Sequence, residues 1–378
     1  MKIGINGYEA VVPRFGYNKT TNLPNRVGSS VYCFELLKNL AKIDVKNNYE
    51  IFLPQSPTND LPKATDTWKY RILPSRKMWT ITSLSLNLLK DRSLDVFFTP
   101  THYLPIFAPK KSVVSILDVS YLYFPELFKK KDLIQLKKWT SYSAKKSMKI
   151  LTISESSKND IIKEYGVKEE KVEVIYPGIN KVSSSKYRVL SMDKLGKKFG
   201  INGKYILFVG TLQPRKNITR LIEAYSKIET DVSLIIVGRR GWKYEEILNA
   251  PEKYNVKDKV LFLENVTDEE LPVLYKNAEF FILPSLYEGF GIPVLEAMNY
   301  GTPVITSNVS SLPEAGGDAA LYVDPNSVSD ISEKMKKLLE DDNLKKQLIE
   351  KGKKQVEKFS WEKSTRETLA VLEEVGRG

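Results

Sequence analysis

The chain has 378 residues, of which 42% are hydrophobic and 28% charged, and its 58 basic and 46 acidic residues give a formal net charge of +12. Its single cysteine, Cys33, and single histidine, His102, exclude an internal disulfide, a redox dithiol pair and a zinc site built from three or four protein ligands. The length exceeds one ordinary core and suits two domains of about 150–200 residues, while the positive charge favours anionic partners such as phosphates, acidic membranes or nucleic acid.

The first half alternates short apolar, β-branched runs with segments of helical period, which is typical of a parallel sheet flanked by helices. The opening MKIGINGYEA is patterned as a buried strand without an export signal, and no apolar run reaches 18 residues, so we expect a cytoplasmic protein without a membrane span. Ser154 is a candidate helix N-cap. Strands are predicted at residues 2–6, 49–53, 70–73, 95–99, 112–117, 149–153 and 172–175, and helices at about 28–42, 79–90, 126–146 and 154–165.

The pattern stops at residues 176–188, a turn followed by small polar residues, which we interpret as a domain boundary. A second set of alternating elements follows, so the predicted fold class is α/β, with two doubly wound Rossmann-like domains facing each other across a cleft. Strands are predicted at 205–209, 232–237, 259–263, 279–283, 303–306 and 320–323, and helices near 217–228, 244–248, 268–276 and 292–300, with a helical tail over 328–374.

Four polar or glycine-rich motifs follow strands of the second set, where ligands bind in such sheets. After the first strand, Gly210 begins a loop that carries Arg215 and Lys216 to a helix starting near Asn217. Free N–H groups at a helix N-terminus and two adjacent cations suit a diphosphate. The alternative is a pair of solvated charges, but cations are electrostatically unfavourable at that helix end. The motifs lie at residues 209–217, 236–242, 263–266 and 284–293.

The last of these motifs places Glu288 eight residues before Glu296, with Gly289, Phe290 and Gly291 between them. The glycines allow close backbone approach to a ligand, and the two carboxylates can accept hydrogen bonds from sugar hydroxyl groups, as a carboxylate does from a ribose diol. In the alternative interpretation, the acids only complement the helix dipole and the glycines only turn the chain.

Together these strings resemble the retaining glycosyltransferases of family four, and most of all their mannosyltransferase-like branch. The resemblance covers nearly the whole chain, is dense over residues 204–325, and implies a GT-B fold in which the second domain binds a nucleotide-sugar donor and the first an acceptor. It implies an N-terminal domain over 1–180, a C-terminal domain over 181–360 and a final helix over 361–378 that crosses back to the first domain. The strings are GTLQPRKN (210–217), PSLYEGFGIPVLEAM (284–298), GTPVIT (301–306) and GDAALYVDP (317–325).

The resemblance also implies residue roles. Arg215 and Lys216 would hold the donor diphosphate beside Gly210, Glu288 would contact hydroxyls of the transferred sugar, and Glu296 would bind the nucleotide ribose. The remaining donor contacts would be the amides of Gly289, Phe290, Gly291 and Ile292 at the sugar-phosphate, the backbone around Val266 at the base, and Gly28 in the loop RVGSS (26–30) at the phosphates.

The first domain departs from the family pattern in one position. Many relatives carry His-Asp after the fifth strand, whereas this chain has Leu117 followed by Asp118. We expect Asp118 to belong to the catalytic set and, with His102, to border the acceptor side. A loop histidine bonded only to backbone is an equal alternative for His102. Residues 11–25 are either an acceptor-side flap or a disordered polar loop.

The resemblance implies a reaction without a protein base, because the leaving phosphate oxygen can take the acceptor's proton when attack and departure share one sugar face. No DxD motif is present, and we interpret Glu340-Asp341-Asp342 as a solvated face, so we predict a metal-independent hexosyltransferase without a cofactor. The favoured donor is GDP-mannose, with UDP-glucose second. Alternatives are a nucleotide-sugar epimerase, a binding-only relative of this fold, or a nucleic-acid-binding protein, which no known motif supports.

The segment 128–149 carries eight lysines, with Leu133, Leu136, Trp139 and Tyr142 at roughly helical spacing. Such a helix can lie peripherally on the anionic inner face of a membrane and bring the enzyme to a lipid-linked glycan, which suits polysaccharide biosynthesis. In the alternative, its apolar face packs on the sheet and its lysines are solvated.

Overall fold

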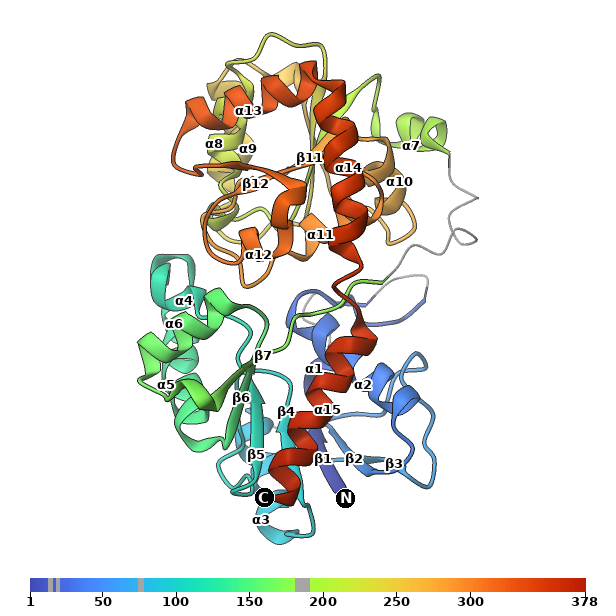
Figure 1. Ribbon diagram of the computed structural model, residues 1–378, viewed down its shortest axis with the longest axis vertical. Coiled ribbons are helices and arrows are strands. Elements are labelled where there is room, and N and C mark those ends of the chain that lie inside the picture. The colour runs from blue at the N-terminus through green and yellow to red at the C-terminus, as the bar shows by residue number, and fades with distance from the viewer. Residues whose placement is uncertain (13–15, 18–20, 74–77, 181–190) are drawn as a thin grey trace. The chain divides into compact units, whose positions relative to one another are not determined.

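The structure is a computed structural model in which residues 1–12, 16–17, 21–73, 78–180 and 191–378 are described (Figure 1). The predicted boundary at 176–188 and the predicted flap at 11–25 fall partly outside these residues. The chain divides into two compact units. The first comprises Met1–Tyr123, Phe128–Gly178 and Phe359–Gly378, and the second comprises Phe124–Leu127 and Ile179–Lys358.

Within the described residues, the first unit holds a seven-stranded parallel sheet in the order β3-β2-β1-β4-β5-β6-β7. The order reverses between β1 and β4, where the Asn6 amide donates to the Thr99 hydroxyl at 2.9 Å and ties the carboxyl ends of both strands together. The strands are β1 (Lys2–Asn6), β2 (Asn48–Leu53), β3 (Trp68–Ile72), β4 (Val96–Thr99), β5 (Ser112–Ser115), β6 (Lys149–Thr152) and β7 (Val172–Val174).

Helices cover both faces of this sheet. One face, with Ile3, Ile5 and Ile51, packs on α2 and on α15, which lie side by side (Figure 1). Because successive strand side chains point to opposite faces, Phe52 and Phe97 pack on α3 instead. The helices are α1 (Tyr8–Val11), α2 (Ser29–Ile43), α3 (Ser85–Lys90), α4 (Ser120–Tyr123), α5 (Lys130–Lys146), α6 (Glu155–Tyr165) and α15 (Trp361–Arg377).

Two helices predicted in the first half of the chain are interrupted. The one at 79–90 begins as a π-helical turn, Thr80–Leu84, in a β-branched run that restricts side-chain rotamers in an α-helix. The one at 126–146 starts with the 3₁₀ turn Pro125–Leu127, which buries Leu127, and restarts at Lys130 after an extended Lys129. The N-cap predicted at Ser154 is confirmed, since its side chain accepts from the Ser157 amide at 3.0 Å.

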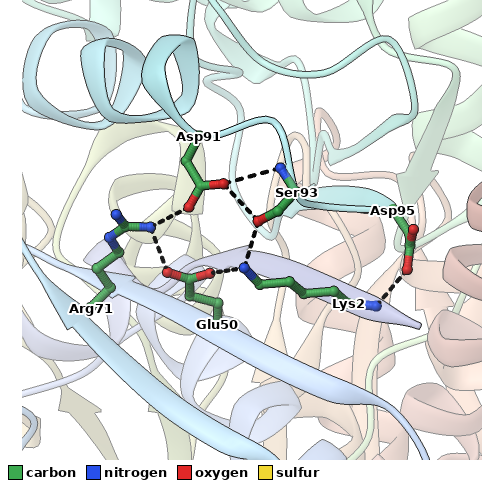
Figure 2. A network of polar contacts seen from close by, with 6 residues as sticks. All are labelled: Lys2, Glu50, Arg71, Asp91, Ser93 and Asp95. Atoms are coloured by element: carbon green, nitrogen blue, oxygen red, sulfur yellow. Dashed lines mark hydrogen bonds and ion pairs between the residues drawn. The ribbon is translucent and has the colours of Figure 1, made fainter.

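A polar network lies over β1, β2 and β3 beside the end of α3 (Figure 2). Glu50 accepts from Lys2 at 3.0 Å and from Arg71 at 2.8 Å, and Arg71 also pairs with Asp91 at 2.6 Å. Ser93 closes the ring by donating to Asp91 and accepting from Lys2, each at 2.6 Å. The network thereby fixes the edge strand β3 to the chain entering β4.

The second unit holds a six-stranded parallel sheet over its described residues, in the order β10-β9-β8-β11-β12-β13. The order again reverses once, between β8 and β11. The predicted α/β class with two doubly wound sheets is therefore confirmed. The strands are β8 (Tyr205–Val209), β9 (Ser233–Val237), β10 (Val260–Leu263), β11 (Phe280–Leu283), β12 (Val304–Ser307) and β13 (Ala320–Val323).

The helices of the second unit differ from the prediction in four places. The helix predicted to end at residue 248 runs on through a buried Pro251, and α7 and α12 were not predicted. The predicted tail is three helices, because the side chains of Asp341 and Ser360 cap new N-termini. The elements are α7 (Met192–Phe199), α8 (Ile218–Tyr225), α9 (Glu245–Lys253), α10 (Leu271–Asn277), α11 (Ile292–Asn299), α12 (Leu312–Gly316), α13 (Val328–Glu340) and α14 (Asp342–Val356).

Gly178 lies directly against the start of α15, where a Cβ atom would overlap backbone atoms of Ser360 and Trp361. We expect Gly178→Ala to lower the free energy of unfolding by about 1–3 kcal/mol, because backbone cannot move aside as a side chain can. Urea unfolding followed by tryptophan fluorescence measures this.

The matched control is Gly376→Ala, in α15 itself, where the new methyl group meets mainly the flexible end of Met1. Alanine also favours a helix over glycine by up to about 1 kcal/mol, so no loss is expected. Equal losses in both variants would contradict the role given to Gly178.

Candidate active site

The candidate site lies at the carboxyl edge of the second sheet, at the reversal between β8 and β11. Doubly wound sheets bind ligands at this position, because the loops after the two strands leave in opposite directions. The loop after β8 carries Arg215 and Lys216, and the loop after β11 carries Glu288. The Leu286 amide donates to the Arg215 carbonyl at 2.9 Å, so the two loops are joined directly.

Asn217 fixes the loop after β8. Its backbone is left-handed, with φ 61° and ψ 28°, between the 3₁₀ turn Pro214–Lys216 and α8. Its side-chain amide donates to the carbonyls of Pro284 at 3.0 Å and Pro325 at 2.6 Å. The sequence predicted a helix start near this residue but not this bridge between loops, which places the two cations ahead of α8.

The glycines of this edge allow backbone to approach backbone. A Cβ atom on Gly238, after β9, would overlap the carbonyl of Gly210. The Leu212 amide donates to the Arg239 carbonyl and the Gly241 amide to the Leu212 carbonyl, at 2.9 and 3.0 Å. The loop after β8 is therefore braced along its length before it reaches Arg215.

Arg215, Lys216 and Glu288 form one buried ionic cluster, which we call the charge triad. Lys216 Nζ lies 2.6 Å from Glu288 Oε1, and an Arg215 guanidinium nitrogen lies 3.2 Å from Glu288 Oε2. Lys216 is 8% exposed and Glu288 is 7% exposed. The alternative in which Lys216 is merely a solvated charge is therefore wrong, because its ammonium is buried against a carboxylate.

The cations keep Glu288 ionised. Burial raises the pKa of this carboxyl, but the charges of Lys216 and Arg215 and the hydrogen bonds it accepts outweigh burial and bring the pKa to about 2. The triad consequently carries two positive charges and one negative charge at neutral pH. Its net charge of +1 favours an anionic ligand, and its carboxylate supplies hydrogen-bond acceptors beside that ligand.

The turn after Glu288 is held from the segment between β12 and α12. Ser310 Oγ accepts from the Glu288 amide at 3.0 Å, and Ser311 Oγ donates to the Glu288 carbonyl at 2.8 Å. Gly291 has φ 107°, a conformation that favours glycine, and a Cβ atom there would lie 2.8 Å from Leu312. The sequence analysis missed both serines, since no local pattern marks them.

Phe290 and Ile292 flank Gly291 at the start of α11. The Phe290 side chain is buried, with 2% exposed, so it packs inside the unit. The helix begins at Ile292 with Pro293 in its first turn, as predicted. The stretch Gly289 to Ile292 therefore leads from the charge triad to a helix N-terminus.

Glu296 lies on α11, half-buried, with Oε2 accepting from the Tyr275 hydroxyl at 3.0 Å. Burial raises the pKa of Glu296, as does the charge of Asp268, whereas the Tyr275 hydrogen bond lowers it. Tyr275 was not predicted. Val266 is half-buried in the loop after β10, one residue beyond the left-handed Asn265, which has φ 59°.

The predicted residues of the first unit lie around the carboxyl edge of its own sheet. Gly28 is the N-cap of α2, with φ 53°, in agreement with the predicted helix start. Asp118 Oδ1 accepts from the Ser120 amide at 2.9 Å at the start of α4. The ring of His102 lies 6.5 Å from that of Tyr121. Leu117, in the position of the family's histidine, is 7% exposed and packs in the core.

The following statements hold for residues 1–12, 16–17, 21–73, 78–180 and 191–378. In them, no three His, Cys, Asp or Glu side chains gather closely enough to hold a metal ion. In the same ranges, no helix has the length and apolar character needed to cross a membrane.

Comparison with known families defines the class of protein. The model "Glycosyltransferase Family 4" matches residues 27–182, and "Glycosyl transferases group 1" matches residues 192–355. The protein is therefore a glycosyltransferase. The chain is 33% identical over 305 residues to O-antigen chain mannosyltransferase B of Escherichia coli, covering 79% of this chain and 78% of that protein. It belongs to glycosyltransferase family four, and the resemblance predicted from its motifs is confirmed.

Solved structures agree with this fold. Sucrose-phosphate synthase from Thermosynechococcus elongatus superposes with a TM-score of 0.73 at 17% identity, over 99% of each chain. HepE from Anabaena in complex with UDP-glucose gives a TM-score of 0.70 at 16% identity, over 98% of this chain and 99% of that one. At these identities the likeness shows the GT-B fold, and the nucleic-acid-binding alternative is set aside by the family membership.

The low pKa of Glu288 predicts acid sensitivity. A carboxyl whose folded pKa is depressed contributes stability above its unfolded pKa, and this contribution is lost as the pH falls toward the folded value. With a folded pKa of about 2, we expect a loss of up to about 3 kcal/mol between roughly pH 5 and pH 2. Glu288→Gln should be less stable than wild type near pH 7 and lose less over that interval.

Urea unfolding at a series of pH values measures the slope of the free energy of unfolding against pH for wild type and for Glu288→Gln. Glu269→Gln is the matched control, because Glu269 is exposed in the loop before α10, and it should retain the wild-type slope. The same slope for Glu288→Gln and wild type would show that the charge triad does not set the pKa of Glu288.

Proposed function

We propose that this glycosyltransferase transfers a hexose, with mannose favoured, from a nucleotide diphosphate sugar to a glycan or lipid-linked glycan, with retention of anomeric configuration. The observation that carries this proposal is the charge triad at the strand reversal of the second sheet. A mannosyltransferase at 33% identity supports mannose, and the UDP-glucose complex of HepE supports a nucleotide-sugar donor. GDP-mannose is the preferred donor and UDP-glucose the second.

In this proposal, Arg215 and Lys216 bind the donor diphosphate, and Glu288 accepts hydrogen bonds from hydroxyls of the sugar. The amides from Gly289 to Ile292, at the start of α11, face the sugar-phosphate, since the positive end of a helix dipole suits an anion. Gly210 lets the phosphates approach the end of β8, Glu296 binds the ribose and the Val266 backbone contacts the base.

The chemical step is driven by charge. As the bond between sugar and diphosphate lengthens, negative charge accumulates on the leaving oxygen, and the fixed cations of Arg215 and Lys216 stabilise it. The sugar becomes oxocarbenium-like while the carboxylate of Glu288 lies beside it. The acceptor hydroxyl attacks from the face that the diphosphate leaves, and the leaving phosphate oxygen takes its proton. Asp118 and His102 orient the acceptor.

The central prediction concerns Lys216. Lys216→Ala should lower kcat about 100- to 1,000-fold, because the cation acts where charge builds up in the transition state. Glu296→Ala should instead raise the KM for the donor with a smaller change in kcat, since the ribose is held alike in ground and transition states. A thermal-shift screen of GDP, UDP, ADP and their sugars selects the donor, and steady-state kinetics measure both variants.

Lys204→Ala is the matched control. Lys204 precedes the amino end of β8, 72% exposed and paired with Glu279 at 2.9 Å, so its removal leaves the carboxyl edge intact. Its kinetics should equal those of wild type. Wild-type turnover in Lys216→Ala, with the same donor, would overturn the assignment of the diphosphate site.

We also propose that turnover needs no divalent metal ion. The support is the positive charge that the triad and the start of α11 supply where a metal would otherwise neutralise the diphosphate. Activity should therefore be unchanged after EDTA treatment in metal-free buffer. A strict requirement for Mn²⁺ or Mg²⁺ would refute this part of the proposal.

A further part of the proposal is peripheral contact with an anionic membrane through α5. Its inner side buries Thr140, Ser143 and Ala144 in the first unit. Leu133 and Leu136, which were predicted on the apolar face, also pack against the core of the first unit, as in the alternative interpretation. Its outer side exposes Ile134, at 66%, between the lysine pairs 130–131 and 137–138. An exposed apolar side chain among cations suits the surface of an anionic bilayer.

Liposome co-sedimentation measures this contact. Wild type should bind vesicles of phosphatidylglycerol and phosphatidylcholine but not pure phosphatidylcholine. Lys137→Glu/Lys138→Glu should bind more than about tenfold less tightly, because each reversed charge loses about 1 kcal/mol of attraction or more. Lys353→Glu/Lys354→Glu on α14 changes the net charge equally and should bind as wild type does. No binding of wild type to anionic vesicles would remove the membrane from the proposal.

A further inference from the structure

The side chain of Tyr275 is held rigidly next to Glu296. Its ring is fully buried, stacked on Tyr300 with centroids 5.6 Å apart and planes at 13°, and tilted against Phe281, also at 5.6 Å. Its backbone carbonyl accepts from the Thr302 hydroxyl at 2.6 Å. Because both ring contacts and backbone are held, the phenol hydroxyl has little freedom to move.

The Tyr275 hydroxyl meets a carboxylate on a neighbouring helix. It donates to Glu296 Oε2 at 3.0 Å, joining α10 to α11. Burial raises the pKa of Tyr275 well above its ordinary value, so the phenol stays protonated and acts as the donor. An ionised carboxylate has about four acceptor positions on two oxygens, so this bond leaves acceptor capacity for a ligand.

We propose that Tyr275 is a positioning residue for the donor: its hydroxyl holds the Glu296 carboxylate in the orientation that accepts both hydroxyls of the nucleotide ribose. The inference rests on the proposed function, in which Glu296 binds the ribose. Tyr275 itself does not touch the ligand in this arrangement. It fixes one carboxylate oxygen, so that less side-chain freedom is lost when the diol binds.

The same hydrogen bond keeps Glu296 in the form that binds a diol. Only the ionised carboxyl accepts from both hydroxyls without offering a competing proton. Burial and the charge of Asp268, in the loop before α10, raise the pKa of Glu296, and the bond from Tyr275 on α10 lowers it. Diol binding should therefore weaken as the pH falls through the pKa of Glu296, and loss of the Tyr275 hydroxyl should move that weakening to higher pH.

The test uses Tyr275→Phe in the full chain, which keeps the stacked ring and removes only the hydroxyl. The probes are GDP or UDP, whichever binds wild type, and the corresponding 2′,3′-dideoxynucleoside diphosphate, measured by calorimetry from pH 5 to pH 8. Tyr275→Phe should bind the ribonucleotide about tenfold more weakly, a typical loss for a hydrogen bond to a charged group. It should bind the dideoxynucleotide as tightly as wild type does. The fall in its affinity for the ribonucleotide toward acid pH, its acid limb, should lie at higher pH than in wild type.

Tyr225→Phe is the matched control. Tyr225 is 1% exposed, and its hydroxyl donates to the Val232 carbonyl at 2.8 Å, so this variant also loses a buried hydrogen bond. It should bind both probes as wild type does. A purely structural role of Tyr275 predicts equal weakening for both probes and an unmoved acid limb, and that result would overturn the inference.

Glu296→Ala separates the inference from the proposed function. If neither nucleotide binds wild type, or if Glu296→Ala binds the ribonucleotide normally, the assigned ribose site is wrong. If Glu296→Ala weakens ribonucleotide binding and Tyr275→Phe does not, the ribose site stands and the positioning role of Tyr275 is wrong. Selective weakening of the ribonucleotide in both variants supports both.

Discussion

The pairing of Glu288 with Lys216 and Arg215 is the constraint on which the second unit's functional edge depends. Two cations removed from water are unfavourable unless an opposite charge and good hydrogen bonds compensate them. Here the compensating carboxylate comes from a loop 72 residues further along the chain. The loops after β8 and β11 must therefore be positioned accurately against each other. The hydrogen bond from Asn217 to Pro284 joins the two loops, and the hydrogen bonds of Ser310 and Ser311 hold the backbone of Glu288. The charge triad is therefore held in place by contacts within the second unit itself.

The topology of the sheet makes this meeting of loops achievable. Because the strand order reverses between β8 and β11, neighbouring strands send their following helices to opposite faces and leave the space above their carboxyl ends open. The absence of a side chain at Gly238 then lets its loop pack against the carbonyl of Gly210, backbone to backbone, beside that space. The strand order and the ion pairs of the charge triad thus constrain the same loops, those after β8 and β11.

Much of this was predictable from sequence, for identifiable reasons. Strands such as β1 and β8 matched the predicted ranges because largely buried strands are short apolar runs with clear turn signals at their ends. Arg215, Lys216 and Glu288 stood out because charges beside glycine-rich loops are locally conspicuous. The contacts of Ser310, Ser311 and Tyr275 were not predictable, since each is made with a residue far away in sequence. The helix running through Pro251 was missed because proline ordinarily ends a helix.

The first unit is formed from segments far apart in the chain, and this has a consequence for biosynthesis. Its core includes Trp361, Leu372 and Val375 of α15, whereas all of the second unit except Phe124–Leu127 lies between Gly178 and that helix. At roughly 5–20 residues per second, a ribosome takes on the order of ten to forty seconds to translate that interval. During this time the nascent first unit presents an uncovered apolar face beside α2. Translation of the second unit is complete before translation of the first unit is. The first unit of this enzyme can therefore complete its core only after the second unit has been translated.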